Sequence, residues 1–88
     1  MKLIGKIVKG TKIVKQASIE KTDSKMSYTD LLEDCLINLC SKLDIQVPLW
    51  LEKNTREFAR FRKTFFTDEQ FMDKVNFDRF EIKVDSDI

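Results

Sequence analysis

The chain has no histidine, only two glycines, one proline and two cysteines among its 88 residues. Histidine is the commonest general base of enzymes, so its absence excludes a Ser–His or Cys–His nucleophile. Gly5 and Gly10 are too few to form a glycine-rich phosphate loop. We therefore expect a protein that is not an enzyme and has neither catalytic residues nor a cofactor.

The two cysteines, Cys35 and Cys40, match no zinc-binding spacing, and no histidine is available to complete a site. Five residues apart on a predicted helix, their Cα atoms would be roughly 8–9 Å apart, which is beyond the reach of a disulfide. The acidic residues near Asp68 and Asp73 lack the EF-hand pattern. We expect no metal site, and two core cysteines in a reducing compartment.

Long apolar runs are also missing. No stretch approaches the ~20 apolar residues that span a bilayer, and Lys2, Lys6 and Lys9 interrupt any signal peptide. The sequence therefore predicts a cytoplasmic protein with no membrane partner. Sixteen basic residues oppose fifteen acidic ones, without the basic excess that is usual in nucleic-acid-binding proteins. Residues 1–26 and 50–65 are mainly basic, whereas residues 27–49 and 66–88 are mainly acidic.

What the chain has in quantity is aromatic side chains in its second half. All seven phenylalanines and the single tryptophan lie between Trp50 and Phe80. Because aromatic side chains bury large apolar areas, we expect the core to form around them.

The first half predicts a β-hairpin followed by a helix. Residues 2–9 and 12–20 are rich in Ile, Val and Lys and flank Gly10, which suits the first central position of a type II′ turn. This register pairs Val8 with Ile13 and Ile7 with Val14, and it sets Lys6 opposite Lys15, an unfavourable pair unless acidic residues lie nearby. Apolar residues then recur at helical spacing over residues 28–43, with Ser27 or Thr29 as the N-cap.

The second half predicts further helices and one strand. Residues 49–64 fit either one helix or two helices that break at Asn54 and Thr55. Thr67 and Gln70 resemble a capping box for a short helix over residues 67–74. Residues 77–84 alternate as a strand does, with Phe80, Ile82 and Val84 on one side. This strand would bring acidic residues to the lysine-rich hairpin.

These elements predict an α+β domain of order β-β-α-α-α-β. We expect a three-stranded antiparallel sheet, made of the N-terminal hairpin plus the C-terminal strand, that is covered on one face by two or three helices. Residues 1–88 would form a single domain with residues 85–88 frayed.

The composition favours a small domain that acts through protein contact, with a homodimer as one form of self-association. If nine aromatic residues exceed what one small core can hold, some must face a partner. The candidates for such an interface are Trp50, Phe65 and Phe66.

Nucleic-acid binding is the alternative, through a basic helix face. On one helix Lys53, Arg56, Arg60 and Lys63 would form a stripe, and the candidate phosphate contacts are Arg56, Arg60, Arg62 and Lys63. The phenylalanines of that helix would point away from the cations, which argues against base stacking on the same surface.

A third interpretation is a small apolar ligand bound under the aromatic residues. A pocket lined by Phe58, Phe61 and Trp50 would support this interpretation.

Overall fold

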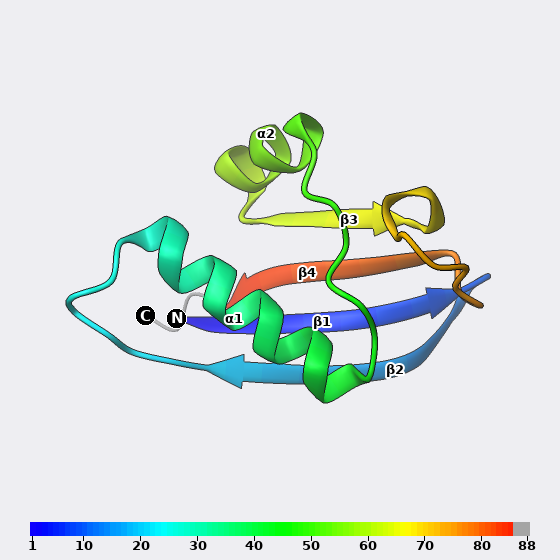
Figure 1. Ribbon diagram of the computed structural model, residues 1–88, viewed down its shortest axis with the longest axis horizontal. Coiled ribbons are helices and arrows are strands. Elements are labelled where there is room, and N and C mark those ends of the chain that lie inside the picture. The colour runs from blue at the N-terminus through cyan, green and yellow to red at the C-terminus, as the bar shows by residue number, and fades with distance from the viewer. Residues whose placement is uncertain (86–88) are drawn as a thin grey trace.

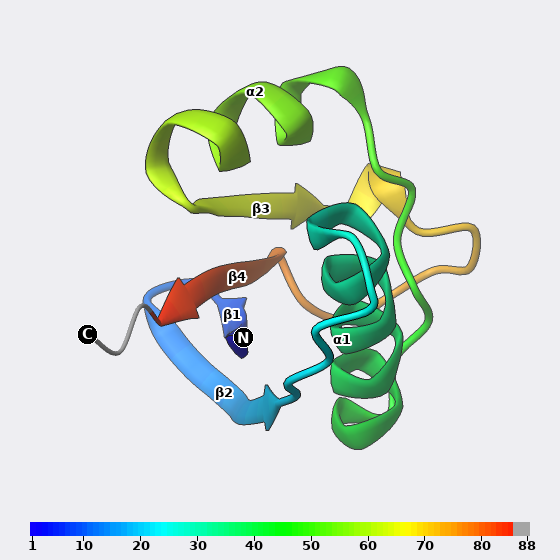
Figure 2. The same ribbon diagram turned by 90° about the vertical axis from the view of Figure 1, so that its left-hand side faces the viewer.

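A four-stranded antiparallel sheet organises the chain, and the computed structural model describes residues 1–85 of it (Figure 1). The elements in chain order are β1 (Lys2–Lys9), β2 (Lys12–Glu20), α1 (Tyr28–Leu43), α2 (Glu52–Phe61), β3 (Lys63–Thr67), the 3-10 turn η1 (Asp68–Gln70) and β4 (Arg79–Asp85). The strand order across the sheet is β2-β1-β4-β3. Figure 2 shows α1 on one face of the sheet and α2 alongside β3. Within residues 1–85, no helix covers the other face, which we call the open face.

The predicted three-stranded sheet is wrong because residues 63–67 form a fourth strand. α2 ends at Phe61, where Arg62 adopts a left-handed backbone conformation with φ 58°. The chain then reverses into β3, whose residues alternate between exposed and buried. The architecture is α+β, with a four-stranded sheet and two helices in place of the expected three-stranded sheet covered by two or three helices. The strand was missed because Lys63 and Thr64 had been assigned to the end of the helix expected over residues 49–64, and Phe65 also fits the helical spacing of Phe58 and Phe61.

The two open questions about the second half also have structural answers. Residues 52–61 form one helix, and Asn54 lies inside its first turn, where its side-chain oxygen accepts a hydrogen bond from the Leu51 N–H at 2.9 Å. No break occurs at Asn54 and Thr55. The short helix predicted over residues 67–74 shrinks to η1, although Gln70 accepts a hydrogen bond from the Thr67 N–H at 3.1 Å, as a capping box requires.

The hairpin turn is confirmed, but its register is partly wrong. Gly10 has φ 61°, as the first central residue of a type II′ turn requires, and Val8 pairs with Ile13. A bulge beyond that pair then shifts the ladder by one residue, so that Lys6 pairs with Gln16 and not with Lys15. On its other side Lys6 pairs with Glu81 of β4. The predicted lysine clash is therefore removed by the bulge, and an acidic residue of the last strand does reach the hairpin.

The core lies between the sheet and α1. Ser27 caps α1 through a 3.1 Å hydrogen bond from the Asp30 N–H, and the helix buries Leu39, Cys35 and Cys40 among others. Phe66 and Phe80 stack with their ring centroids 5.7 Å apart and are fully buried. The aromatic core is thus confirmed for most, although not all, of the phenylalanines.

Two expectations concern the termini and membranes. Asp85 is the last residue of β4, whereas the expected fraying of residues 86–88 lies outside the described residues. None of the helices in residues 1–85 has the length and apolar character to cross a bilayer.

Candidate site on the open face of the sheet

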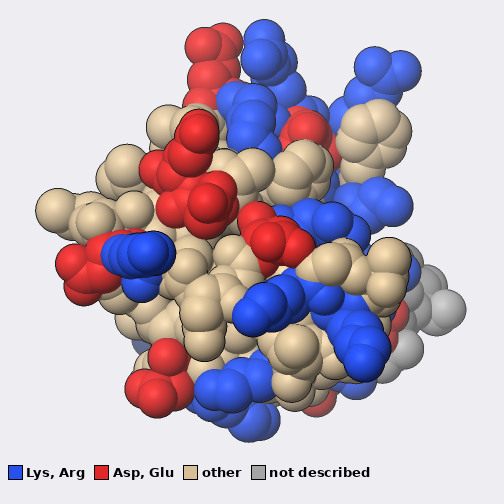
Figure 3. All heavy atoms as spheres, turned by 90° about the vertical axis from the view of Figure 1, so that its right-hand side faces the viewer, with Lys and Arg blue, Asp and Glu red and all other residues tan. Residues whose placement is uncertain are grey.

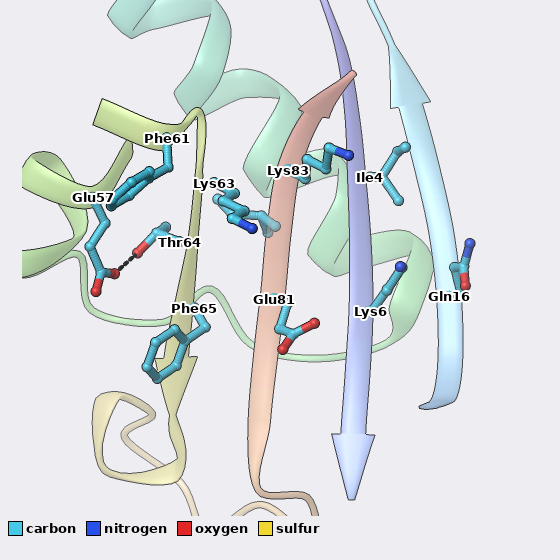
Figure 4. Close-up of a pocket in the computed structure, with 11 residues that line it drawn as sticks. Ile4, Lys6, Gln16, Glu57, Phe61, Lys63, Thr64, Phe65, Glu81 and Lys83 are labelled. Atoms are coloured by element: carbon cyan, nitrogen blue, oxygen red, sulfur yellow. Dashed lines mark hydrogen bonds between the residues drawn. The ribbon is translucent and has the colours of Figure 1, made fainter. Parts of the chain in front are cut away.

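The open face carries a regular array of side chains from all four strands. The strand register creates two adjacent rows across the sheet. The first row is Lys63, Lys83, Ile4 and Ser18, and the second row is Phe65, Glu81, Lys6 and Gln16. All of these residues except Ser18 line a hollow of about 560 Å³, which the end of α2 borders through Glu57 and Phe61 (Figure 4). We call this hollow the sheet site.

Lys63 and Lys83 are directly opposite each other in the sheet site. At the next position along the ladder, the Val84 N–H donates a hydrogen bond to the Arg62 carbonyl at 2.9 Å. Because bonded and non-bonded pairs alternate in an antiparallel ladder, Lys63 and Lys83 form a non-hydrogen-bonded pair, in which side chains lie closest. Like charges in such a position destabilise a sheet. Within residues 1–85, neither ammonium group has a carboxylate within 4.0 Å.

The acidic residues of the sheet site interact with cations outside it. Glu81 forms a 2.6 Å ion pair with Arg79, and Glu57 lies 4.0 Å from the Lys53 ammonium. Glu57 also accepts a 2.6 Å hydrogen bond from the Thr64 hydroxyl. Their charges are therefore partly offset already, whereas the lysines of the sheet site have no such partner in the described part of the chain.

Two aromatic rings of the sheet site are exposed to solvent and lie beside basic side chains of α2. Phe61 is 56% exposed and has the Arg60 guanidinium 5.3 Å from its ring centroid. Phe65 is 38% exposed and has the Lys53 ammonium 4.2 Å from its centroid. The expectation that the rings point away from the cations is wrong for Phe61, because the Arg60 guanidinium lies near its ring, and for Phe65, because this residue belongs to β3 and not to the helix. Lys63 is on β3, so the predicted basic stripe loses its last member.

The other arginines predicted to contact nucleic acid lie elsewhere. Arg56 is exposed on α2 and does not line the sheet site. Arg62 turns toward α1, where its guanidinium lies 5.7 Å from the Tyr28 ring centroid. Of the four arginine and lysine candidates, the structure brings Lys63 to the sheet site, and Arg60 contacts the ring of Phe61 without lining the hollow itself.

The predicted protein-interface residues are separated by the fold. Phe66 is fully buried, and only Phe65 is on the open face. Trp50 is half-buried, with Phe58 and Phe66 at centroid distances of 5.8 and 5.7 Å, and its indole N–H donates to Thr55 at 2.8 Å. These three residues do not form one surface.

The residues of the sheet site that the sequence analysis did not assign to it include Ile4, Lys6, Glu57 and Lys83. The signal was present for three of them, because period-two alternation in residues 2–9 and 77–84 assigns Ile4, Lys6 and Lys83 to the face opposite the core. Because the strand β3 was not predicted, the sequence analysis placed no aromatic residue next to these side chains.

A second hollow, of about 610 Å³, runs between α1 and α2, and we call it the helix groove. Its lining is largely apolar and includes Phe58 and Trp50, together with Tyr28, Leu32, Leu36, Val47, Pro48 and Ala59. Phe61, which was expected to share a pocket with Phe58 and Trp50, borders the sheet site instead.

At each edge of the sheet, one outward backbone carbonyl accepts a hydrogen bond from a lysine of a helix. Met1 and Lys21 exchange backbone hydrogen bonds, and bonded and non-bonded pairs alternate along the ladder between β1 and β2. Ser18, opposite Ile4, is therefore in a non-bonded pair, and its carbonyl points outward from β2. This carbonyl accepts a hydrogen bond from the Lys42 ammonium at 3.1 Å. On β3 the outward Phe65 carbonyl accepts from Lys53 at 3.0 Å. Such cover hinders the pairing of another strand with either edge. A ligand is therefore more readily accommodated on the open face than at an edge.

The cysteines offer no reactive centre. Both are completely buried, and burial raises the pKa of the Cys40 thiol to about 12 and also raises the pKa of Cys35. Both thiols are therefore protonated at neutral pH. Across residues 1–85, no three His, Cys, Asp or Glu side chains come together as a metal site would need.

Comparison with protein-family models, with curated protein sequences and with solved structures finds no match to this chain.

Proposed function

We propose that this protein binds single-stranded nucleic acid on the open face of its sheet. The observation that carries the proposal is the opposed pair of Lys63 and Lys83, which has no acidic partner within residues 1–85 and lies next to the exposed rings of Phe61 and Phe65. Such an arrangement costs the free protein electrostatic energy, and an anion placed between the two ammonium groups would remove that cost.

The ligand that matches both parts of the site carries anions and flat rings at short intervals. Lys and Arg side chains contact phosphates, and exposed aromatic rings stack on bases with about 1–3 kcal/mol per base. A single strand is favoured over a duplex because only unpaired bases can leave their own stack to reach a protein ring. Lys63 and Lys83 of the first row and Lys6 of the second row, on three adjacent strands, are the phosphate contacts that this proposal assigns (Figure 4).

The distribution of charge also supports the proposal, although the net charge is only +1. In Figure 3 the open face forms the right-hand side of the molecule, where blue Lys and Arg atoms predominate, and most red Asp and Glu atoms lie toward the left. A local basic surface attracts a polyanion even where the total charge is small. The two buried, protonated thiols fit the cytoplasm, where cysteines stay reduced.

Fluorescence polarisation with labelled single-stranded DNA of about 15 nucleotides tests the proposal, a length within the range of known single-strand sites. We expect binding at low salt that weakens as the salt concentration rises. The K63Q/K83Q double variant should lower the affinity about tenfold and reduce the slope of log K against log salt by about 0.7 per lysine. F61L/F65L should weaken binding with little change in the slope, because leucine keeps the apolar volume and loses the ring.

The matched control is K25Q/K74Q, which removes the same charge from two exposed lysines outside the sheet site. If the control loses as much affinity as K63Q/K83Q, binding depends on overall charge and the site is wrong. No binding at about 50 mM salt would remove the proposal altogether.

Protein contact is a second candidate, at a different surface. Val47, Leu49 and Leu51 are each about half exposed around Trp50, next to the helix groove. The walls of the groove carry opposite charges, Glu33 on α1 and Arg62 at the end of α2, so a second copy related by a two-fold axis could pair them reciprocally. Light scattering after size exclusion tests this candidate: a dimer that L49S/L51S converts to a monomer supports it, and a monomer at high concentration opposes it.

A further inference from the structure

Phosphate binding explains neither carboxylate of the sheet site; Glu81 is already held in a 2.6 Å ion pair with Arg79, whereas Glu57 lies 4.0 Å from its nearest cation, Lys53. A carboxylate repels phosphates, yet Glu57 borders the hollow together with the exposed rings. We propose that Glu57 selects bases that carry an exocyclic amino group, so that the site prefers cytosine to thymine. This inference rests on the proposed binding of single-stranded nucleic acid.

The side chains of the sheet site separate into two sides, as Figure 4 shows. Phe61, Phe65 and the carboxylate of Glu57 lie on the α2 side of β3, whereas Lys63 and Lys83 point over β4 and β1, and Lys6 extends from β1 toward β2. A strand that follows β3 would therefore place its phosphates over the lysines and its bases toward α2. In that position the bases stack on the two rings, and their edges reach the Glu57 carboxylate.

Glu57 is held in a defined orientation, with one oxygen left for a ligand. Its Oε1 accepts from the Thr64 hydroxyl at 2.6 Å, and that hydroxyl in turn accepts from the Asn54 amide at 2.8 Å. Among the described residues, no hydrogen bond or ion pair engages Oε2. The chain of hydrogen bonds orients the carboxylate and leaves Oε2 without a partner among the described residues.

An ionised carboxylate can only accept hydrogen bonds. Cytosine offers the amino group at N4 and adenine the one at N6, whereas thymine presents the acceptor O4 at the corresponding position. Glu57 therefore stabilises an amino-bearing base and repels thymine. For a partly exposed contact we expect a preference of about three- to tenfold between otherwise equal ligands, at the lower end of the discrimination that base-edge contacts give.

The comparison of oligo(dC) with oligo(dT) isolates this effect, because both are pyrimidines of equal ring size and equal charge. Polarisation assays at one salt concentration should give tighter binding of oligo(dC) by the wild type. The E57Q variant should abolish or invert the preference, because glutamine presents an amino group that can donate to thymine O4. Removal of a negative charge raises the affinity for both oligomers, so the readout is the ratio of the two affinities.

The control is E52Q, the same charge change at an exposed residue of α2 that does not line the hollow. It should leave the ratio unchanged. Equal binding of both oligomers by the wild type overturns the inference about Glu57 while nucleic-acid binding stands. A preference that survives in E57Q also overturns it, since the selection then resides elsewhere. If neither oligomer binds, the proposed function itself fails.

Discussion

The side-chain amide of Gln70 donates a 2.9 Å hydrogen bond to the side-chain oxygen of Asn54, and both residues are almost completely buried, at 3% and 0% exposure. The same Asn54 donates to the Thr64 hydroxyl and to the Phe65 carbonyl, at 2.8 and 2.9 Å. Gln70 also donates to the Leu49 carbonyl at 2.9 Å. One polar network thus joins α2, β3, η1 and the segment before α2. It sets where Phe65 and Glu57 lie in the sheet site.

Asn54→Ala should destabilise the protein by about 3 kcal/mol. The substitution leaves several buried partners without hydrogen bonds, and each unsatisfied buried group costs about 1–3 kcal/mol. Urea unfolding followed by circular dichroism measures the change.

The control for this prediction is Asn38→Ala, on the exposed face of α1, where Asn38 bonds only within the helix, to Asp34. Its effect should stay within about 0.5 kcal/mol. A loss of similar size in both variants would mean that the buried network does not contribute more than a surface hydrogen bond.

Gly5→Ala should destabilise the protein because α1 passes directly over Gly5 of β1. A Cβ atom at Gly5 would lie 2.7 Å from Leu39 Cδ2 and 2.9 Å from Phe80 Cε1, so core side chains must shift. Overpacking of this kind costs about 1–3 kcal/mol. Thermal or urea unfolding measures the loss, and the double variant with Leu39→Ala should lose less than the sum of the two single variants.

Gly10→Ala separates this effect from backbone strain. Nothing lies within 4 Å of a Cβ at Gly10, but its φ of 61° disfavours any other residue. We expect a cost of about 1 kcal/mol that Leu39→Ala does not alter. Rescue of Gly10→Ala by the core variant would contradict the packing explanation.

The parts of the fold that were predictable are those with one clear period. The helix over residues 28–43 follows a clear helical pattern, and β4, with Phe80, Ile82 and Val84 on one side, follows a clear alternating pattern. Lys63 to Thr67 was missed because Phe58, Phe61 and Phe65 also satisfy helical spacing. What ends α2 is the left-handed conformation of Arg62, which no glycine or proline announces.

The site was harder to predict than the fold because it combines distant segments. Lys63 is on β3, and Lys83 and Lys6 reach it only through the pairing order β1-β4-β3. Sequence patterns show which face of a strand a lysine occupies, but they do not show which strands become neighbours. The omission of one five-residue strand therefore removed the whole site from view.

Stability should fall between pH 9 and pH 12 through the ionisation of Cys40. Burial raises the pKa of this thiol from 9.0 to about 12, so the folded state binds the proton more tightly than the unfolded state. The stabilisation is fully present below pH 9 and is lost as the pH rises toward 12. Urea midpoints measured at pH 8 and pH 10.5 should differ.

Cys40→Ala is the matched control for the pH dependence. Without the thiol, the decline in the midpoint over this range should become smaller, whereas lysine and tyrosine ionisation continues in both proteins. Equal slopes in the two proteins would show that the thiol titrates normally, in contradiction to its burial.

Lys83→Gln should stabilise the free protein at low salt while it weakens nucleic-acid binding. The substitution removes the repulsion from Lys63, with a gain of up to about 0.5 kcal/mol for an exposed pair. The gain should vanish at about 1 M salt, where charges are screened over ~3 Å. Unfolding midpoints at two salt concentrations measure it, and Lys74→Gln, an exposed lysine outside the sheet site, serves as the control.

A site shaped for a ligand is expected to show this opposition between stability and binding. If Lys83→Gln is destabilising at low salt, the pair is not repulsive in solution, and the main electrostatic reason for an anionic ligand disappears.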